Sequence, residues 1–177
     1  MKKKTDVVYA ERANWKFNGE LVNSFDAHIS KSVPLYKEGH DLICDMSDFF
    51  IKPKSLCYEI GCSTGTLILK LATHHQNKPE AHFIGIDIEE DMIKKAEAKL
   101  AKVEGLNASF LAEDVIELDM YEADLIICYY TIQFVKTSVR QNIINSIYEK
   151  LNWGGALFLF EKVRGADARF QDIITAL

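Results

Sequence analysis

The sequence contains no apolar run long enough to cross a bilayer as a helix. The basic start, residues 1–6, is not followed by the apolar stretch that a secretory signal needs. These two absences disfavour a membrane-spanning protein and a secreted one. We therefore expect a cytoplasmic protein without a membrane partner.

Paired cysteines are also missing. In a reducing compartment we expect free thiols, with Cys62 fitting a turn rather than acting as a nucleophile. His74 and His75 close a predicted helix, where we expect them to face water. With no metal-ligand spacing anywhere, the sequence predicts no metal site. The four cysteines, none of them in a C-x-x-C pair, are Cys44, Cys57, Cys62 and Cys128.

The chain lacks the clustered basic residues of most nucleic-acid-binding proteins. Its formal net charge is −5, and its lysines alternate with acids, as in residues 94–99. This alternation is typical of a solvated helix face. The charge balance predicts a small-molecule substrate and no direct contact with nucleic acid.

What the sequence does contain is a regular alternation of apolar segments and helical patterns within 177 residues, the size of one domain. The alternation predicts a three-layer α/β sandwich with a parallel sheet over residues 51–177. Residues 1–50 are expected to form an N-terminal helical cap that closes over a bound ligand. The predicted strands are a run that ends near Glu59 and residues 81–87, 108–114, 124–130 and 156–160.

Two details of the last βαβ unit can also be predicted. Thr137 or Ser138 is expected to cap a helix whose apolar face extends to Leu151. Residues 153–155, which include two glycines, are expected to turn the chain into the fifth strand.

The most informative segment is the loop of residues 58–66, which follows the first strand and opens a helix. Gly61 and Gly65 let the backbone turn sharply and lie close to a ligand. The loop is not a dinucleotide fingerprint, because Ser63 stands where a second glycine is needed, and it has no P-loop lysine. Glu59, at the strand tip, suits a cationic ligand, which favours S-adenosylmethionine over phosphate groups. The alternative is an ordinary strand-to-helix turn.

Other strand ends carry side chains that suit an adenosine. Parallel strands bring Asp87, Asp114 and Tyr129 to the same edge as Glu59. Asp87 is expected to accept hydrogen bonds from ribose hydroxyls. Asp114 is expected to accept from the adenine amine, the backbone of Val115 to donate to the ring, and Ile88 to pack on its face.

This order of motifs resembles the class I S-adenosylmethionine-dependent methyltransferases, and within them the carboxy-S-adenosylmethionine synthase family, formerly described as tRNA methyltransferases. The resemblance implies a Rossmann-like sheet that binds S-adenosylmethionine, carboxy-S-adenosylmethionine or S-adenosylhomocysteine. The motifs that carry it are Phe25-Asp26-x-His28-Ile29, Ser32-Val33-Pro34-x-Tyr36, Gly61-Cys62-Ser63-x-Gly65, Thr131-Ile132-Gln133-Phe134 and the run from Leu151 to Lys162.

The resemblance further implies conversion of S-adenosylmethionine and prephenate to carboxy-S-adenosylmethionine and phenylpyruvate, for modification of a tRNA wobble uridine. Tyr36 is implied to lie near the methionine end of the cofactor, with Cys62, Ser63 and Tyr129 among the cofactor-binding positions. No catalytic residue is assigned. A small-molecule methyltransferase and an inactive S-adenosylmethionine-binding domain remain alternatives.

The chain departs from the family pattern in three respects. Ile88 and Tyr129 stand where the family usually has asparagine. The family sheet has seven strands that end in an antiparallel hairpin, and only five are legible, so we expect the hairpin and its substrate-binding arginine to be missing. The last strand, residues 156–160, would then be an apolar edge. We therefore expect a homodimer or a poorly behaved monomer.

Overall fold

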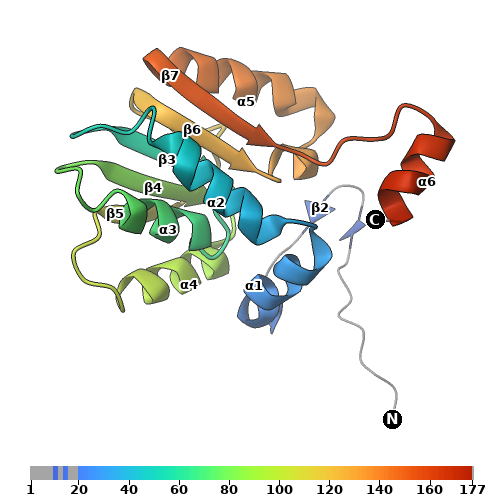
Figure 1. Cartoon of the computed structure of the whole chain (residues 1–177), viewed down its shortest axis with the longest axis horizontal. Helices are drawn as coiled ribbons and strands as arrows, with labels where there is room; N and C mark the ends of the chain where they lie inside the picture. Colours follow the sequence, from blue (N-terminus) through green and yellow to red (C-terminus); the bar gives the residue numbers. More distant parts are fainter. Residues whose placement is uncertain (1–9, 12–13, 16–19, 177) are drawn as a thin grey trace.

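The computed structural model describes residues 10–11, 14–15 and 20–176. Their main feature is a five-stranded sheet with the order β5-β4-β3-β6-β7, in which every pairing is parallel (Figure 1). This confirms the predicted parallel α/β sheet. Its strands are β3 (Leu56–Ile60), β4 (His82–Asp87), β5 (Ala108–Ala112), β6 (Ala123–Tyr129) and β7 (Leu151–Phe160).

Helices cover both faces of this sheet. The helices are α1 (Glu20–Ser32), α2 (Tyr36–Ser47), α3 (Thr66–His74), α4 (Glu90–Leu100), α5 (Thr137–Lys150) and α6 (Ala168–Ala176), with a 3-10 turn η1 (Ile132–Phe134). A two-stranded antiparallel pair, β1 (Ala10–Glu11) and β2 (Asn14–Trp15), precedes α1. No helix in the described part of the chain is both long and apolar enough to span a bilayer.

The core lies in two layers because side chains of each strand alternate between the faces. In β6, Leu125 and Ile127 pack with α2, α3 and α4, whereas Ile126 and Cys128 pack with α5. All four side chains are fully buried, as expected for a central parallel strand. The strand β6 is therefore buried between two helical layers.

The strand order places a topological switch between β3 and β6. From β3 the chain builds outward through β4 and β5, and then returns to the other side of β3 with β6 and β7. Ligands in such sheets bind at the carboxyl ends of the strands beside the switch. The loops after β3 and β6 meet there, because the Thr131 hydroxyl donates a 2.8 Å hydrogen bond to the Ile60 carbonyl.

Two predictions about the last βαβ unit are wrong. The turn expected at residues 153–155 lies within β7, where a register shift lets Leu151 pair with Ala123 while Ala156 pairs with Leu125. Gly154, at φ +82°, absorbs the extra length as an irregularity in the strand. Leu151 accordingly begins β7. The residue before α5 is Lys136, and no side chain caps this end.

Two further expectations need correction. The strand predicted over residues 108–114 ends at Ala112, so Asp114 lies in the following turn. His75 does not face water, because its ring stacks on Phe83, with centroids 5.7 Å apart, and is 2% exposed. His74 lies nearer the surface, with 31% of its side chain exposed.

Candidate functional site

The loop between β3 and α3 is shaped by two glycines. Gly61 and Gly65 have φ of +74° and +72°, a region that other residues enter at a cost. A Cβ on Gly61 would come within 2.3 Å of the Thr131 side chain, and one on Gly65 within 2.5 Å of the Phe110 ring. The loop backbone therefore lies closer to its neighbours than any side chain would permit.

Ser63 stands between the two glycines and shares their conformation. Its φ is +49°, which is strained for a residue with a Cβ. The strain is held in place because the Ser63 N–H donates a 2.8 Å hydrogen bond to Oδ2 of Asp87. Ser63, which stands where a dinucleotide fingerprint has its second glycine, thus keeps the turn of the loop.

Asp87, at the end of β4, joins two segments of the site. Its second oxygen, Oδ1, accepts a 2.9 Å hydrogen bond from the Glu89 N–H. Burial raises the pKa of Asp87, whereas these backbone donors oppose that rise. Each oxygen keeps a lone pair, so the carboxylate can still accept from a ribose hydroxyl. Ile88, the next residue, is 66% exposed and is available to pack on a base.

Asp114 and Val115 lie in the turn after β5, beside the end of β4. Oδ1 of Asp114 accepts a 2.9 Å hydrogen bond from the Ile116 N–H, which fixes the carboxylate in the turn. The Val115 side chain is buried in the layer that α5 covers. Glu113 N–H pairs with the Asp87 carbonyl, so this turn adjoins the end of β4.

Glu59 is the buried acid of the site. Its side chain is 4% exposed, and Oε2 has no hydrogen-bond partner. Burial raises the pKa of Glu59 well above its usual range, and the charge of Asp87 adds to the effect. A buried acceptor without a donor is costly, and a cationic group would relieve that cost. The residues present therefore fit a ligand with an amino or sulfonium group.

Tyr36 and Tyr129 lie against each other near Glu59. Burial raises the pKa of Tyr36, and the charge of Glu59 adds to the rise. The ring centroids of Tyr36 and Tyr129 are 5.2 Å apart, and His40 completes the cluster at 4.8 Å from Tyr129. The Tyr129 hydroxyl donates to the Tyr36 carbonyl at 2.7 Å, so it is directed toward α2.

Cys62 completes the loop as a packing residue. It is 4% exposed, and burial raises the pKa of its thiol well above the usual range. A protonated, enclosed thiol is a poor nucleophile. All four cysteines are free and buried, which confirms the expectation of free thiols.

The sequence did not indicate the polar cluster that ties α1 and α4 to this loop. The Lys99 ammonium lies 2.7 Å from Oδ2 of Asp26 and donates to the hydroxyls of Thr64 and Thr66 at 2.7 and 2.8 Å. Thr64 in turn donates a 2.5 Å hydrogen bond to Oδ1 of Asp26. Burial raises the pKa of Asp26, but bonds from Lys99 and Thr64 outweigh this and lower it. The one sign of this cluster in the sequence was that Asp26 belongs to a family motif. Lys99 could not be told apart from the neighbouring lysines, which were expected to face water.

Two other residues, which directly follow β6 and β7, were also missed. Tyr130 has φ of +57°, an outlier for a bulky residue, and its N–H pairs with the Phe160 carbonyl at 2.8 Å. The Glu161 carboxylate accepts from the N–H groups of Ile132 and Gln133 at 2.7 and 3.1 Å. The two contacts fix the loop after β6, which borders the switch point. Strained backbone of this kind is frequent at functional sites.

Sheet order, the glycine loop and the acids at the strand ends define a class I S-adenosylmethionine-dependent methyltransferase. Residues 58–155 match the family described as a methyltransferase domain. A solved S-adenosylmethionine-dependent methyltransferase from Clostridium acetobutylicum shares the fold, with a TM-score of 0.64 at 19% identity, over 77% of this chain and 56% of that one. The N-methyltransferase NodS of Bradyrhizobium japonicum, solved with S-adenosylhomocysteine, has a TM-score of 0.58 at 23% identity. This match covers 71% of this chain and 61% of NodS.

Within this class the chain belongs to the carboxy-S-adenosyl-L-methionine synthase family. It is 36% identical to such a synthase from Trichodesmium erythraeum over 160 residues, which cover 90% of this chain and 62% of that protein. The Staphylococcus epidermidis synthase is 32% identical, and the match covers 92% of this chain and 70% of that protein. The Shewanella baltica synthase is 30% identical, and the match covers 96% of this chain and 71% of that protein. The chain therefore spans 62% to 71% of these three relatives' lengths. Its class is that of the S-adenosylmethionine-dependent transferases, with S-adenosyl-L-methionine as cofactor.

Proposed function

We propose that this chain converts S-adenosylmethionine and prephenate to carboxy-S-adenosylmethionine and phenylpyruvate. One observation carries the proposal: identity to a named synthase covers 96% of the chain, well beyond the methyltransferase domain at residues 58–155. The matched region therefore takes in α1 and α2 as well as the glycine loop. These helices supply Asp26 and Tyr36, which contact or border the loop.

In this proposal the cofactor lies along the carboxyl edge of β3, β4 and β5. Glu59, with an unpartnered oxygen, receives the cationic methionine end, near which Tyr36 lies. The loop of Gly61, Cys62, Ser63 and Gly65 passes beneath the cofactor. Asp87 accepts from the ribose, Asp114 and Val115 contact the adenine edge, Ile88 covers its face, and Tyr129 supports Tyr36 from below.

The bound cofactor supplies an acidic methyl group beside its sulfonium. Prephenate would lose its ring carboxyl group as carbon dioxide and its ring hydroxyl group as hydroxide when the ring becomes aromatic. The methyl group would give up one proton, which joins that hydroxide to form water, and the methyl carbon would form the new carbon–carbon bond to the carbon dioxide. The chain's part is to orient the methyl and to exclude bulk water. Residues 1–50 serve as the closing segment, since Asp26 of α1 is bound to Thr64 of the loop.

The test is mass spectrometry of the nucleosides formed when the purified chain is incubated with S-adenosylmethionine and prephenate. A product heavier than the cofactor by one carboxylate supports the proposal. Unchanged cofactor, with phenylpyruvate absent, contradicts it. S-adenosylmethionine without prephenate is the control, because non-enzymatic breakdown of the cofactor appears in both samples.

A small-molecule methyltransferase is the second candidate. The observation that favours it is Tyr129, which stands where the family has asparagine and whose hydroxyl is already bonded to Tyr36. Formation of S-adenosylhomocysteine with an acceptor amine or hydroxyl would support it. Cofactor binding with neither product would instead identify an inactive binding domain.

We further propose that the product serves modification of a tRNA wobble uridine by a second enzyme in the cytoplasm, and that the chain forms a homodimer. A net charge of −5 supports a role without direct RNA contact. In the described sheet β7 is an edge strand that pairs with β6 alone, and Leu159 on it is 48% exposed. Sedimentation equilibrium tests the dimer, and a mass of one chain at all concentrations contradicts it.

A further inference from the structure

Three side chains that commonly bind metal ions meet where α2 and α3 end. His74 is the last residue of α3, His75 its C-cap, and Asp48 the C-cap of α2. Among the residues that the structure describes, these form the cluster whose donor atoms all lie within 4.8 Å of one another. Helix α3 starts at the cofactor loop and has nine residues, so the cluster lies about 13 Å from that loop. It is a separate site at the opposite edge of the sheet.

The distances within the cluster suit a small coordination sphere. Nε2 of His74 and Oδ2 of Asp48 are hydrogen-bonded at 3.1 Å, and Nδ1 of His75 lies 3.7 Å from the other carboxylate oxygen, Oδ1. A tetrahedral ion with ligand distances of about 2.0–2.1 Å separates neighbouring donor atoms by about 3.3 Å. The two observed separations lie on either side of that value.

The tautomer of His75 is fixed by Ser47. The Ser47 hydroxyl donates its one hydrogen to the Cys44 carbonyl at 2.6 Å, and it lies 2.7 Å from Nε2 of His75. Nε2 must therefore carry the proton and donate to Ser47. This leaves Nδ1 as a lone-pair donor, which is how a second hydrogen bond orients a metal-binding histidine.

Nδ1 of His75 has no hydrogen-bond partner, although the side chain is fully buried. It faces the carboxylate of Asp48, so two acceptors oppose each other with no hydrogen between them. A cation between them would satisfy Nδ1, whereas Oδ1 already accepts a 3.3 Å hydrogen bond from the Lys78 ammonium. This unpartnered nitrogen is independent of the clustering and points to a ligand.

We propose that Asp48, His74 and His75 bind one divalent transition-metal ion, Zn²⁺ by ligand type, which links the end of α2 to the end of α3. Two imidazoles and one carboxylate form a set that zinc favours and that magnesium and calcium do not. The side chains of Asp48 and His74 are 54% and 31% exposed. Water can therefore complete the coordination from the open side.

The positive charge of Lys78 disfavours binding of a metal ion, so its removal is a control with the opposite expected effect. Its ammonium lies 3.3 Å from Oδ1 of Asp48 and donates to the Ile51 carbonyl at 2.7 Å. It competes for the carboxylate and repels a dication. Removal of this charge in Lys78→Gln is expected to tighten metal binding about tenfold, an effect opposite to that of losing a ligand.

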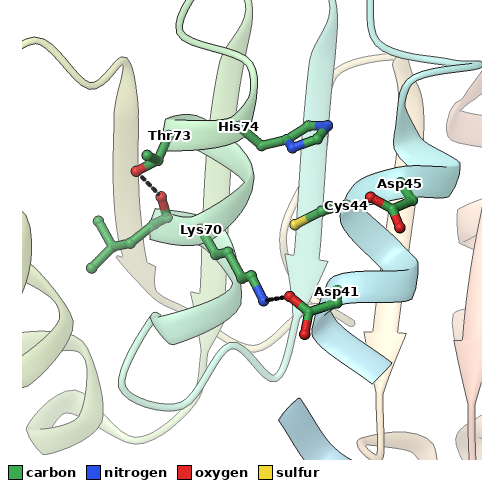
Figure 2. Close-up of a pocket in the computed structure, with 7 residues that line it drawn as sticks. Asp41, Cys44, Asp45, Lys70, Thr73 and His74 are labelled. Carbon is green, nitrogen blue, oxygen red and sulfur yellow. Dashed lines mark hydrogen bonds and ion pairs between the residues drawn. The ribbon is translucent and has the colours of Figure 1, made fainter. Parts of the chain in front are cut away.

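The thiol of Cys44 lies near the cluster, so its part in metal binding has to be tested separately. Figure 2 shows His74 projecting from the end of α3 toward α2 over a groove of about 450 Å³ that Cys44 also lines. Burial raises the pKa of Cys44 to about 11, so the thiol is protonated at neutral pH. Cys44→Ala therefore serves as a control in which metal binding persists.

The experiment is titration of the purified full chain with zinc chloride by calorimetry, with the visible spectrum of Co²⁺ as a second readout of tetrahedral coordination. One equivalent is expected to bind. Asp48→Asn and His74→Gln are each expected to weaken binding about 100-fold, and Ser47→Ala at least about tenfold. His28→Gln, which removes an exposed histidine of α1, and Cys44→Ala are expected to bind as the parent does.

Three results would overturn the proposal. They are the absence of zinc binding, binding that Asp48→Asn and His74→Gln leave unchanged, and binding that Cys44→Ala abolishes. Asp48 and His74 are partly exposed, so their variants are expected to fold, and circular dichroism checks this. His75→Gln alters a buried side chain and is interpreted only alongside those two variants.

Discussion

The phenolic oxygen of Tyr129, at the end of β6, donates a 2.7 Å hydrogen bond to the carbonyl oxygen of Tyr36, the first residue of α2. This bond joins residues 93 positions apart and fastens α2 over the carboxyl edge of the sheet. Gly39 makes the approach possible, because a Cβ there would lie 2.1 Å from the Tyr129 hydroxyl. Tyr129, which stands where the family usually has asparagine, therefore holds α2 in place here.

Tyr129→Phe tests this role. The variant keeps the ring contacts and loses the hydrogen bond, so the free energy of unfolding is expected to fall by about 1 kcal/mol. Affinity for S-adenosylmethionine is expected to fall as Tyr36 loosens. Urea unfolding and calorimetry measure the two effects. Tyr148→Phe, on an 80% exposed side chain, is the matched control; equal effects from both variants would contradict the assignment.

Lys99→Met tests the polar cluster that holds α1 against the loop. Loss of the bonds to Asp26, Thr64 and Thr66 is expected to raise the Kd for S-adenosylmethionine about tenfold while changing stability by under about 1 kcal/mol. Combined with Asp26→Asn, its effect should be less than additive, since the two side chains share one ion pair. Lys102→Met, three residues further on, is the control. Full additivity would show that the cluster does not act as a unit.

Ser63→Gly tests the strain in the loop. At φ +49° a glycine avoids the clash that a Cβ causes, so the variant is expected to gain about 1 kcal/mol of unfolding free energy. Ser63→Ala removes the hydroxyl but keeps the Cβ, and should gain nothing. Denaturant titration of the three proteins separates the two effects. If glycine and alanine behave alike, the conformation carries no strain.

His40→Phe tests the acid sensitivity of the fold. Burial, and then the charge of Lys70, lowers the pKa of His40 to about 4, and Nε2 has no partner. The carboxylates of Asp41 and Asp26 act in the opposite direction and are outweighed. Between about pH 6.5 and 4 the unfolded chain therefore binds a proton that the folded chain rejects.

The stability that His40 contributes is full above pH 6.5 and is lost as the pH falls toward 4. The parent is expected to lose about 2 kcal/mol through His40 between pH 7 and 5. His40→Phe should not show this loss, whereas His28→Phe, on an exposed side chain, should. Urea unfolding at the two pH values measures the difference, and identical pH dependence in all three proteins would contradict it.

The sequence predicted the sheet and the position of the loop because both depend on local patterns. The apolar run of β6 and the glycines around Ser63 are readable without the fold. The irregularity in β7 was not predicted, because Gly154 and Gly155 indicate a turn as readily as a bulge. Only the pairing with β6 decides between them.

The contacts that hold the site together could not be predicted from the sequence, for a different reason. Lys99 lies among alternating charges, and nothing local shows that Asp26, 73 residues earlier, accepts its charge. His75 follows an exposed histidine, and its burial depends on Phe83 from the next strand. In both cases, contacts with residues far away in the sequence determine which polar side chains are buried.

The buried carboxyl of Glu59 has a consequence for the energetics of ligand capture. Burial raises the pKa of Glu59 well above its usual range, and a positive charge beside the carboxyl group would lower that pKa. Capture of a cation there should therefore release protons at pH values between the two pKa values. The heat of association should therefore vary with the ionisation enthalpy of the buffer, and Glu59→Gln should remove that variation. The site would then act as a proton exchanger, in which uptake of S-adenosylmethionine becomes easier as the medium becomes more alkaline.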